Sequence, residues 1–314
     1  MGARIIMKMV ATEALDLAGD VRRLVLRHPR RAVLPRPEAG AHVDIRLPDG
    51  RVRHYSLCGD PDDCSQYVIA VKRENEGRGG SRWIHENIVT GSDVHVSAPR
   101  NHFALAKTAH RHILIAGGIG ITPMLAMAHH LQRRHTPFML HYCAKRAYRA
   151  PLLADVVALC RTDMRGWFSG DPGGVRFDAT AVLADVSPET HIYCCGPTRL
   201  VDAVRAAAAH LPPSRLHVET FVPAVQGPTR PFDIVIASTG QTFHVPAEHS
   251  ALSVLHDNGF RIASSCKLGV CGSCECRYRS GVVIHRDVVL DPDRRTDTLL
   301  LCVSRGEDRL VLDL

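Results

Sequence analysis

Four cysteines have the type and spacing of ligands to an iron–sulfur cluster: Cys266, Cys271, Cys274 and Cys302. The first three follow the pattern C-x4-C-x2-C and the fourth lies well downstream, which is the ligand spacing of one class of 2Fe–2S cluster. Two irons need four thiolates, and glycines inside the first loop let its backbone bend toward the cluster sulfurs. Because such a cluster transfers one electron at a time, we predict that this chain moves single electrons.

Other uses of these cysteines fit the sequence less well. Structural zinc sites usually pair two C-x2-4-C units, and this chain has one. Disulfide frameworks are typical of small secreted domains, so they fit a chain of 314 residues less well. Cys276 follows shortly after the third ligand, and we expect it to be a packed thiol and not a ligand. Eleven cysteines without a recognisable leader segment lead us to expect a reducing, cytoplasmic location.

The composition is typical of a multidomain globular chain. Its 314 residues predict two or three domains, and a hydrophobic content of 45% is enough for separate cores. The net charge of +7 fits an acidic protein partner, an anionic cofactor or a basic surface that only keeps the protein soluble. Aromatic residues make up 5% of the chain, which argues against a stacking platform for nucleic acid. The longest apolar run, residues 113–128, is too short and too interrupted to span a membrane. We expect a monomer that binds neither nucleic acid nor a membrane.

The secondary structure that must position these residues differs from one part of the chain to the next. Over residues 1–104, short segments rich in Val, Ile and Tyr alternate with turn signals, which predicts an antiparallel β-barrel or sandwich. The expected strands are residues 21–26, 42–47, 51–57, 67–71 and 93–96.

Residues 105–224 alternate strands with helices, which predicts an α/β domain with a parallel, helix-covered sheet. The expected strands are residues 112–116, 138–143 and 191–195, and the expected helices are 123–134, 152–160 and 199–210. Prolines and a glycine make residues 221–231 a linker. Residues 225–314 form the third domain, with a hairpin over 232–237 and 241–245 and a helix over 251–257 ahead of the cysteine loop.

Two segments of the middle domain could bind a dinucleotide. A glycine turn follows the first strand and opens a helix, so backbone N–H groups would face a pyrophosphate. We expect Thr122 to cap that helix and Pro123 to take its first position. A Cys-Gly-Pro segment ends a later strand and should lie at the same sheet edge, where such sheets bind ligands. The predicted residues are Gly117, Gly118, Ile119, Gly120, Ile121, Thr122, Pro123, Cys195, Gly196 and Pro197.

A flavin site is suggested by one strand of the first domain. It places a cation, an aromatic plane and a hydroxyl at adjacent positions, although composition alone makes it an ordinary polar strand. A loop with basic residues and glycines precedes a probable helix and is a second candidate phosphate site. The predicted residues are Arg53, His54, Tyr55, Ser56, Lys72, Arg73, Gly79, Gly80 and Ser81.

Taken together, these motifs resemble the phthalate dioxygenase reductase family, which includes the vanillate O-demethylase reductases. The resemblance covers essentially the whole chain and its domain order, and it also includes the motif Pro99-Arg100-Asn101-His102-Phe103. It implies an FMN-binding barrel, an NAD domain and a C-terminal α+β (β-grasp) 2Fe–2S ferredoxin domain. It also implies that electrons pass from NADH to a Rieske-type oxygenase.

The resemblance implies roles for individual residues. Arg53 and Ser81 would bind the FMN phosphate, and Tyr55 would pack on the flavin. Ser56 would hydrogen-bond near flavin N5, and Cys195 would lie near the nicotinamide, so these two are the candidate catalytic residues.

One further residue, Phe221, resembles the family's aromatic that can cover the flavin ring.

The choice of nicotinamide cofactor and of acceptor stays open at this stage. The second strand of the middle domain ends in Lys145 and Arg146, chemistry that favours NADPH, whereas the resemblance favours NADH, which we adopt. Alternatives are a related flavin reductase that contains FAD or feeds a different acceptor, and a redox sensor that binds these cofactors without turnover.

Overall fold

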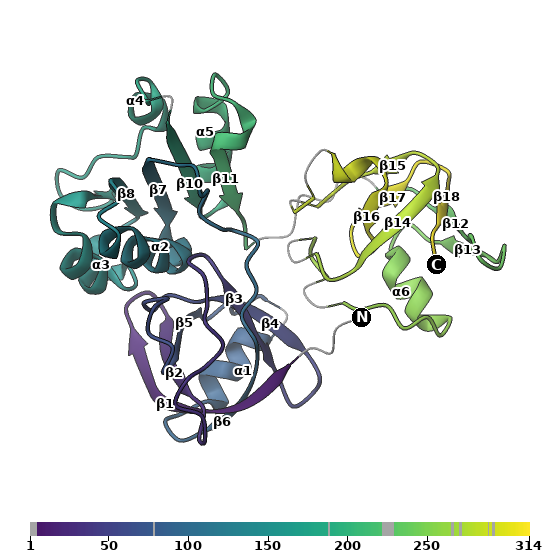
Figure 1. Cartoon of the computed structure of the whole chain (residues 1–314), viewed down its shortest axis with the longest axis horizontal. Coiled ribbons are helices and arrows are strands. Elements are labelled where there is room, and N and C mark those ends of the chain that lie inside the picture. Colours follow the sequence, from purple (N-terminus) through teal and green to yellow (C-terminus); the bar gives the residue numbers. More distant parts are fainter. Residues whose placement is uncertain are drawn as a thin grey trace. The chain divides into compact units, whose positions relative to one another are not determined.

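The chain forms two compact units in the computed structural model, Met1–Glu219 and Thr220–Leu314 (Figure 1). The structure describes residues 5–77, 79–187, 189–221, 229–264, 267–269, 272–287, 289–290 and 293–314. The first unit contains a β-barrel and an α/β sheet, and the second contains a smaller mixed sheet. The boundaries after residues 104 and 224 stay predictions.

The barrel consists of six antiparallel strands in the order β4-β3-β6-β1-β2-β5. A bridge between Leu57 and Ile69 joins the β4 end to β5 and closes the sheet. All five predicted strands are confirmed, and β1 was not predicted. The elements are β1 (Ile6–Leu17), β2 (Val21–Arg27), β3 (His42–Arg46), β4 (Val52–Ser56), β5 (Tyr67–Lys72), α1 (Gly80–Asn87) and β6 (Asp93–Ser97).

The middle sheet has five parallel strands in the order β11-β10-β7-β8-β9, as the strand–helix alternation predicted. The strands are β7 (Arg111–Gly117), β8 (Phe138–Ala144), β9 (Met164–Phe168), β10 (Thr190–Cys195) and β11 (Leu216–Glu219). The helices are α2 (Ile121–Arg133), α3 (Leu153–Cys160), α4 (Ala179–Leu183) and α5 (Thr198–Ala207). Side chains alternate between the two faces, so Leu114 packs with α2 and α3, whereas Ile115 packs with α4 and α5.

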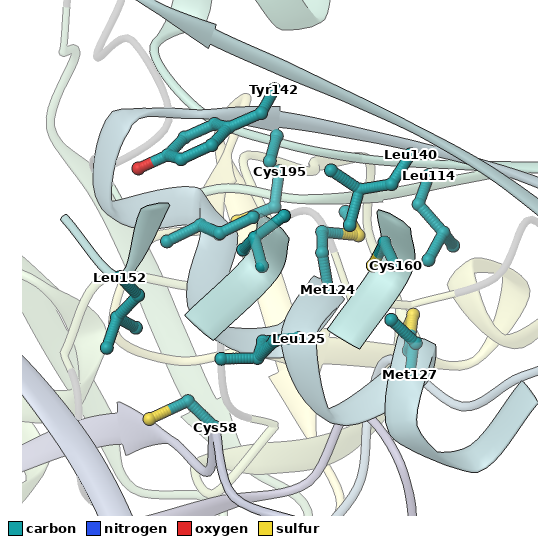
Figure 2. Close-up of a cluster of buried hydrophobic side chains, with 14 of the residues drawn as sticks. Cys58, Leu114, Met124, Leu125, Met127, Leu140, Tyr142, Leu152, Cys160 and Cys195 are labelled. Atoms are coloured by element: carbon teal, nitrogen blue, oxygen red, sulfur yellow. The ribbon is translucent and has the colours of Figure 1, made fainter. Parts of the chain in front are cut away.

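One hydrophobic core joins the barrel to the parallel sheet. Figure 2 shows Cys58, which follows β4, in the same cluster as Leu125 of α2, Leu152 before α3 and Cys195 of β10. Because interiors pack as densely as crystals, such a shared core fixes the end of β4 against this domain. This is what positions the candidate active site.

The second unit is a five-stranded mixed sheet in the order β13-β12-β18-β14-β16, with a separate β15–β17 pair. The predicted hairpin and the predicted helix α6 are confirmed, and Ser250 caps the helix through a capping box. The elements are β12 (Phe232–Ile236), β13 (Thr242–Val245), α6 (Ala251–Asp257), β14 (Glu275–Ser280), β15 (Val283–Ile284), β16 (Thr298–Leu300), β17 (Arg305–Gly306) and β18 (Arg309–Leu312).

Single turns of 3-10 helix connect several elements: η1 (Gly118–Gly120), η2 (Ala147–Arg149), η3 (Arg161–Asp163), η4 (Pro213–Arg215) and η5 (Arg294–Thr296). Within the described ranges, none of the helices has the length and apolar character needed to cross a bilayer.

Buried histidines should make the first unit sensitive to acid. Burial lowers the pKa of His42 to about 3 and the pKa values of His112 and His141 to about 4. Each imidazole is neutral in the folded state, whereas the unfolded chain takes up protons below about pH 6.5. The contribution of these histidines to stability is therefore complete above pH 6.5 and decreases as the pH falls toward 4.

The measurement is the free energy of unfolding at several pH values between 7 and 4. Replacing His141 by Gln should reduce the slope by up to about 1.4 kcal/mol per pH unit, because one titrating group is lost. Replacing the exposed His210 by Gln is the matched control and should leave the slope unchanged. Equal slopes for His141→Gln and the wild type would contradict this account.

Candidate active site

The two dinucleotide-binding segments meet at one edge of the parallel sheet. Strands β7 and β10 are parallel neighbours, and Ala116 pairs with Cys195 at their carboxyl ends. A Cβ atom on Gly117 would lie 2.6 Å from Cδ of Pro197, and a Cβ atom on Gly120 would overlap the carbonyl of Cys195. The glycines therefore allow the turn to pack directly on the Cys-Gly-Pro segment.

The helix after this turn begins earlier than the sequence suggested. Helix α2 starts at Ile121, with Gly120 as its N-cap, so the predicted cap at Thr122 and the predicted first position for Pro123 are wrong. The Thr122 hydroxyl instead donates to the Ile119 carbonyl at 3.0 Å. Pro123 is tolerated because N–H groups of the first turn have no partner within the helix.

Replacing Gly120 by Ala should damage nucleotide binding. The new methyl group would collide with main-chain atoms of Cys195 and Gly196, which cannot rotate away. Relief requires the turn and the Cys-Gly-Pro segment to separate, and we expect the KM for NADH to rise about tenfold or more, since small misplacements at such sites cost up to 10²-fold. Steady-state kinetics test this. An unchanged KM in Gly120→Ala would contradict the assignment.

Three side chains converge where the barrel meets this sheet edge. Ser56 ends β4, Cys195 ends β10 and Glu219 ends β11, and Cys195 is the register partner of Glu219. The Ser56 hydroxyl donates to Oε2 of Glu219 at 3.5 Å, and the Cys195 thiol reaches the same oxygen at 3.9 Å. Ser56 and Cys195 are buried. The two candidate catalytic residues are therefore linked by a carboxyl group.

The electrostatics of this site favour protonated groups. Burial raises the pKa of Glu219 to about 8, while hydrogen bonds from Ser56 and Cys195 act to lower it. Burial also raises the pKa of the Cys195 thiol well above its usual value, and the nearby Glu219 adds to that shift. Cys195 is thus a neutral, packed thiol at physiological pH and not a thiolate nucleophile.

Arg53 lies against the turn that opens α1. A Cβ atom on Gly80 would overlap the Arg53 guanidinium, and Gly79 adopts φ of 72°, a conformation that favours glycine. The guanidinium also donates to the carbonyl of Val52 at 2.9 Å. Tyr55 packs against the barrel core. The structure thus brings Arg53, Gly79 and Gly80 together at a helix N-terminus.

Other proposed flavin residues have partners elsewhere. His54 lies 2.7 Å from the Asp44 carboxylate, its cross-strand neighbour, whereas strand alternation directs Arg53 and Tyr55 to the opposite face.

The remaining proposed flavin residues, from the end of β5 to the start of α1, have local partners. Lys72 pairs with Glu74 at 2.7 Å and Arg73 with Glu86 at 3.4 Å. The Ser81 hydroxyl accepts a hydrogen bond from the Glu74 amide at 3.1 Å. The places of His54, Lys72, Arg73 and Ser81 in a flavin site remain predictions.

Two of the four predicted iron ligands lie in the described chain, and the structure brings them together. Cys274 lies in the turn before β14 and Cys302 in the turn after β16, and both are buried. These strands are antiparallel neighbours, and the Leu301 amide donates to the Cys274 carbonyl at 3.2 Å. Cys266 and Cys271 lie outside the described residues.

The loop glycines have the conformations that the cluster site requires. Gly269 and Gly272 have φ values of 74° and 67°. A Cβ atom on Gly269 would lie 2.7 Å from Cγ2 of Val303, next to Cys302. Two buried thiols on adjacent turns, with a glycine loop packed against one of them, fit the thiolate cage of a 2Fe–2S cluster.

Cys276 is a packed thiol, as expected. Its Sγ donates to the Arg277 carbonyl at 3.2 Å, and burial raises its pKa to about 12. Residues two apart in a strand share a face, so alternation alone would not separate Cys276 from Cys274. The two residues differ in position, since Cys274 lies in the turn before β14 and Cys276 within the strand, and both pack into the same core.

Two further predictions concern residues near the nucleotide site. Phe221 is 41% exposed and belongs to the second unit, so its role over the flavin remains a prediction. Lys145 and Arg146 follow β8 and are exposed. Asp171, which sequence reasoning missed, accepts from the Ala147 amide at 2.9 Å and places an acid beside them.

Comparison with known proteins identifies relatives over essentially the whole chain. The 2Fe-2S iron-sulfur cluster binding domain family matches residues 234–306. A phthalate 4,5-dioxygenase oxygenase reductase subunit from Pseudomonas putida is 41% identical over 95% of this chain and 94% of its own length. The solved structure of phthalate dioxygenase reductase has a TM-score of 0.74 and 38% identity, and the alignment covers 98% of each chain.

A further similar structure belongs to a larger protein. An intact type IV self-sufficient cytochrome P450 monooxygenase gives a TM-score of 0.88 at 35% identity, and the match covers 99% of this chain but 41% of that one.

The fold, the cysteine site and these matches define an NAD(P)H-dependent reductase with a flavin domain, an NAD domain and a 2Fe–2S domain, of the kind that serves oxygenases. The chain belongs to the phthalate dioxygenase reductase family, which includes vanillate O-demethylase reductases.

Proposed function

We propose that this chain takes a hydride from NADH onto FMN and passes single electrons through its 2Fe–2S cluster to a Rieske-type oxygenase. The observation that supports this most is the convergence of Ser56, Cys195 and Glu219 beside the glycine turn. The proposed flavin strand, the proposed nucleotide-binding sheet edge and a half-buried carboxyl group meet there.

The residues present fit the implied cofactors. Arg53 and the turn of Gly79 and Gly80 would bind the flavin phosphate, because a guanidinium and helix N–H groups favour an anion. The turn that includes Gly117 and Gly120 would bind the dinucleotide pyrophosphate. When bound, the flavin accepts two electrons as hydride and releases them one at a time to the cluster.

For the cluster itself, we propose Cys266, Cys271, Cys274 and Cys302 as the four iron ligands.

Glu219 places a half-buried carboxyl group beside Ser56 and Cys195. Its carboxyl group is protonated below about pH 8 and accepts from the Ser56 hydroxyl. Ser56 thus positions the hydrogen bond and Glu219 holds the proton.

We expect the bound flavin to be FMN. One phosphate suffices for the single cradle formed by Arg53, Gly79 and Gly80, and FAD would need an additional adenine platform. Flavin released by denaturation and separated against FMN and FAD standards tests this directly. FAD as the released species would contradict the expectation.

We also expect NADH to be preferred over NADPH. Asp171 lies against Ala147, immediately after the basic pair Lys145 and Arg146, and its carboxylate would repel a 2′-phosphate near this strand end. Comparing kcat/KM for the two cofactors tests this, and a higher value with NADPH would overturn it.

A second candidate acceptor is a cytochrome P450. The observation that favours it is the P450 monooxygenase whose reductase part is similar to this entire chain. Turnover with a purified Rieske oxygenase, compared with turnover with a P450, separates the two. Electron transfer to the P450 but not to the Rieske protein would replace the first proposal.

A further inference from the structure

A buried arginine lies close to the cluster site. Arg305 is 4% exposed and follows Cys302 by three residues, so their Cα atoms lie within about 11 Å of each other. Fully buried arginines are rare unless they are paired with an acid, because a charge in the interior loses its hydration. The question is what offsets this charge.

Main-chain carbonyls surround the guanidinium. Nη1 donates to the carbonyl of His249, and Nη2 donates to those of Arg230 and Pro246 at 2.8 and 2.9 Å. The guanidinium carbon also lies 4.6 Å from the centre of the Phe232 ring. In the part of the chain that the structure describes, the hydrogen-bond acceptors of Arg305 include no carboxylate. Among these described residues, main-chain dipoles solvate its positive charge.

The segment that Arg305 holds leads directly to the cluster turn. His249 and Pro246 precede helix α6, and the amide of Leu252 in that helix donates to the carbonyl of Leu301 at 2.9 Å. Leu301 is the residue before Cys302. Arg305 and the Cys302 turn therefore lie on the same side of the domain, connected through the start of α6.

The neighbouring charges leave this cation largely uncompensated. Arg286 acts on Arg305 as a like charge, and Glu248 acts as an opposite charge but is exposed and screened by water. The negative charge of Asp287, which is also buried, does have a partner. Arg295 lies 3.5 Å from its carboxylate and offsets that charge. Burial lowers the pKa of Arg305, although a guanidinium remains charged.

We propose that Arg305 is a positioning residue that raises the reduction potential of the 2Fe–2S cluster through its buried, uncompensated positive charge. Reduction adds a negative charge to the cluster, and a fixed cation nearby stabilises the reduced form. At an effective dielectric constant of about 20, a unit charge roughly 10–20 Å away changes such an equilibrium by about 4- to 16-fold. The consequence is a more favourable electron transfer from flavin to cluster. This inference rests on the proposed cluster ligands.

The test is a redox titration of the full-length holoprotein, following the cluster by its visible absorbance. Arg305→Gln should lower the midpoint potential by about 35–70 mV, the one-electron equivalent of a 4- to 16-fold change at about 59 mV per tenfold. Arg309→Gln, which removes an exposed cation from the same domain, is the matched control and should leave the potential unchanged. An Arg305→Gln protein with intact cluster absorbance and the wild-type potential would overturn the proposal.

A second variant keeps the test decisive if Arg305→Gln does not fold. In Arg305→Lys the charge is retained, but the introduced amine lacks a carboxylate partner and should lose its proton more easily than a free lysine. Its midpoint potential should match the wild type at pH 6 and fall below it by pH 10. Equality at both pH values would overturn the proposal.

A failure of the proposed ligand set has a different signature. Iron and sulfide would then be absent from the wild-type protein itself.

Discussion

Replacing Cys302 by Ser should abolish electron transfer to one-electron acceptors that require the cluster, while NADH still reduces the flavin. The cysteine lies in a turn of the second unit, whereas the proposed flavin and nucleotide residues other than Phe221 lie in the first. Losing an outer-shell partner of a metal ligand already costs about 10–100-fold, so loss of a ligand should cost more than about 100-fold. The measurements are cytochrome c reduction and anaerobic bleaching of the flavin bands.

The matched control for this variant is Cys276→Ser. Cys276 is a buried thiol of the same domain that donates to a main-chain carbonyl, and its serine variant should keep its cluster and its one-electron activity. Loss of flavin reduction in a folded Cys302→Ser protein would contradict the division of labour between the units. Unchanged cytochrome c reduction would contradict the ligand assignment.

Replacing Glu219 by Gln should remove a titration near pH 8 from NADH-dependent turnover. Burial raises the pKa of this carboxyl group to about 8, and the amide has nearly the same shape but cannot titrate. General acid–base assistance is typically worth about 10²–10⁴-fold, and we expect a loss of about 100-fold, at the lower end. Initial rates between pH 6 and 9 measure both effects.

The same variant should change how stability depends on pH. The folded-state pKa of Glu219 lies above the unfolded value of about 4.3, so its favourable contribution is complete below that pH and is lost as the pH rises toward 8. Between pH 5 and 8 this amounts to roughly 4 kcal/mol at most. Glu219→Gln should therefore gain stability relative to the wild type as the pH rises.

The exposed Glu189 of the same domain provides the control for both measurements. Glu189→Gln should retain the wild-type pH profile of turnover and of unfolding. A step near pH 8 that persists in Glu219→Gln would show that another group titrates there.

Periodicity and turn signals predicted the succession of barrel, parallel sheet and hairpin but missed several strands, and one of these, β1, shows their limit. Strand β1 contains Met, Ala, Glu and Leu, which favour helices in isolation. Its burial alternates from Met7 to Met9 to Ala11, and pairing with both β2 and β6 stabilises it as a strand. Such tertiary pairing is not encoded in local propensity.

The candidate site shows the same division between local and long-range information. The glycine turn and the Cys-Gly-Pro segment were identifiable because each follows a strand, and parallel strands end at one edge. Glu219 was missed because both of its partners are distant in sequence. Ser56 lies on a barrel strand, whereas Cys195 lies on the parallel sheet. The available signal was that Glu219 ends a short strand. That strand lies next to the strand of Cys195, and the two residues are register partners.

Local sequence also failed to separate neighbours on a single strand. His54 stands between Arg53 and Tyr55, yet it faces Asp44 on the adjacent strand. Strand alternation predicts that separation only once the pairing partner is known.

The most direct test of the electron relay is the visible absorption spectrum of the purified protein before and after anaerobic addition of NADH. The account predicts flavin bands together with iron–sulfur absorbance, and both should bleach when NADH is added. Flavin bands without iron–sulfur absorbance, persisting after reconstitution with iron and sulfide, would contradict the assignment of Cys266, Cys271, Cys274 and Cys302 as cluster ligands.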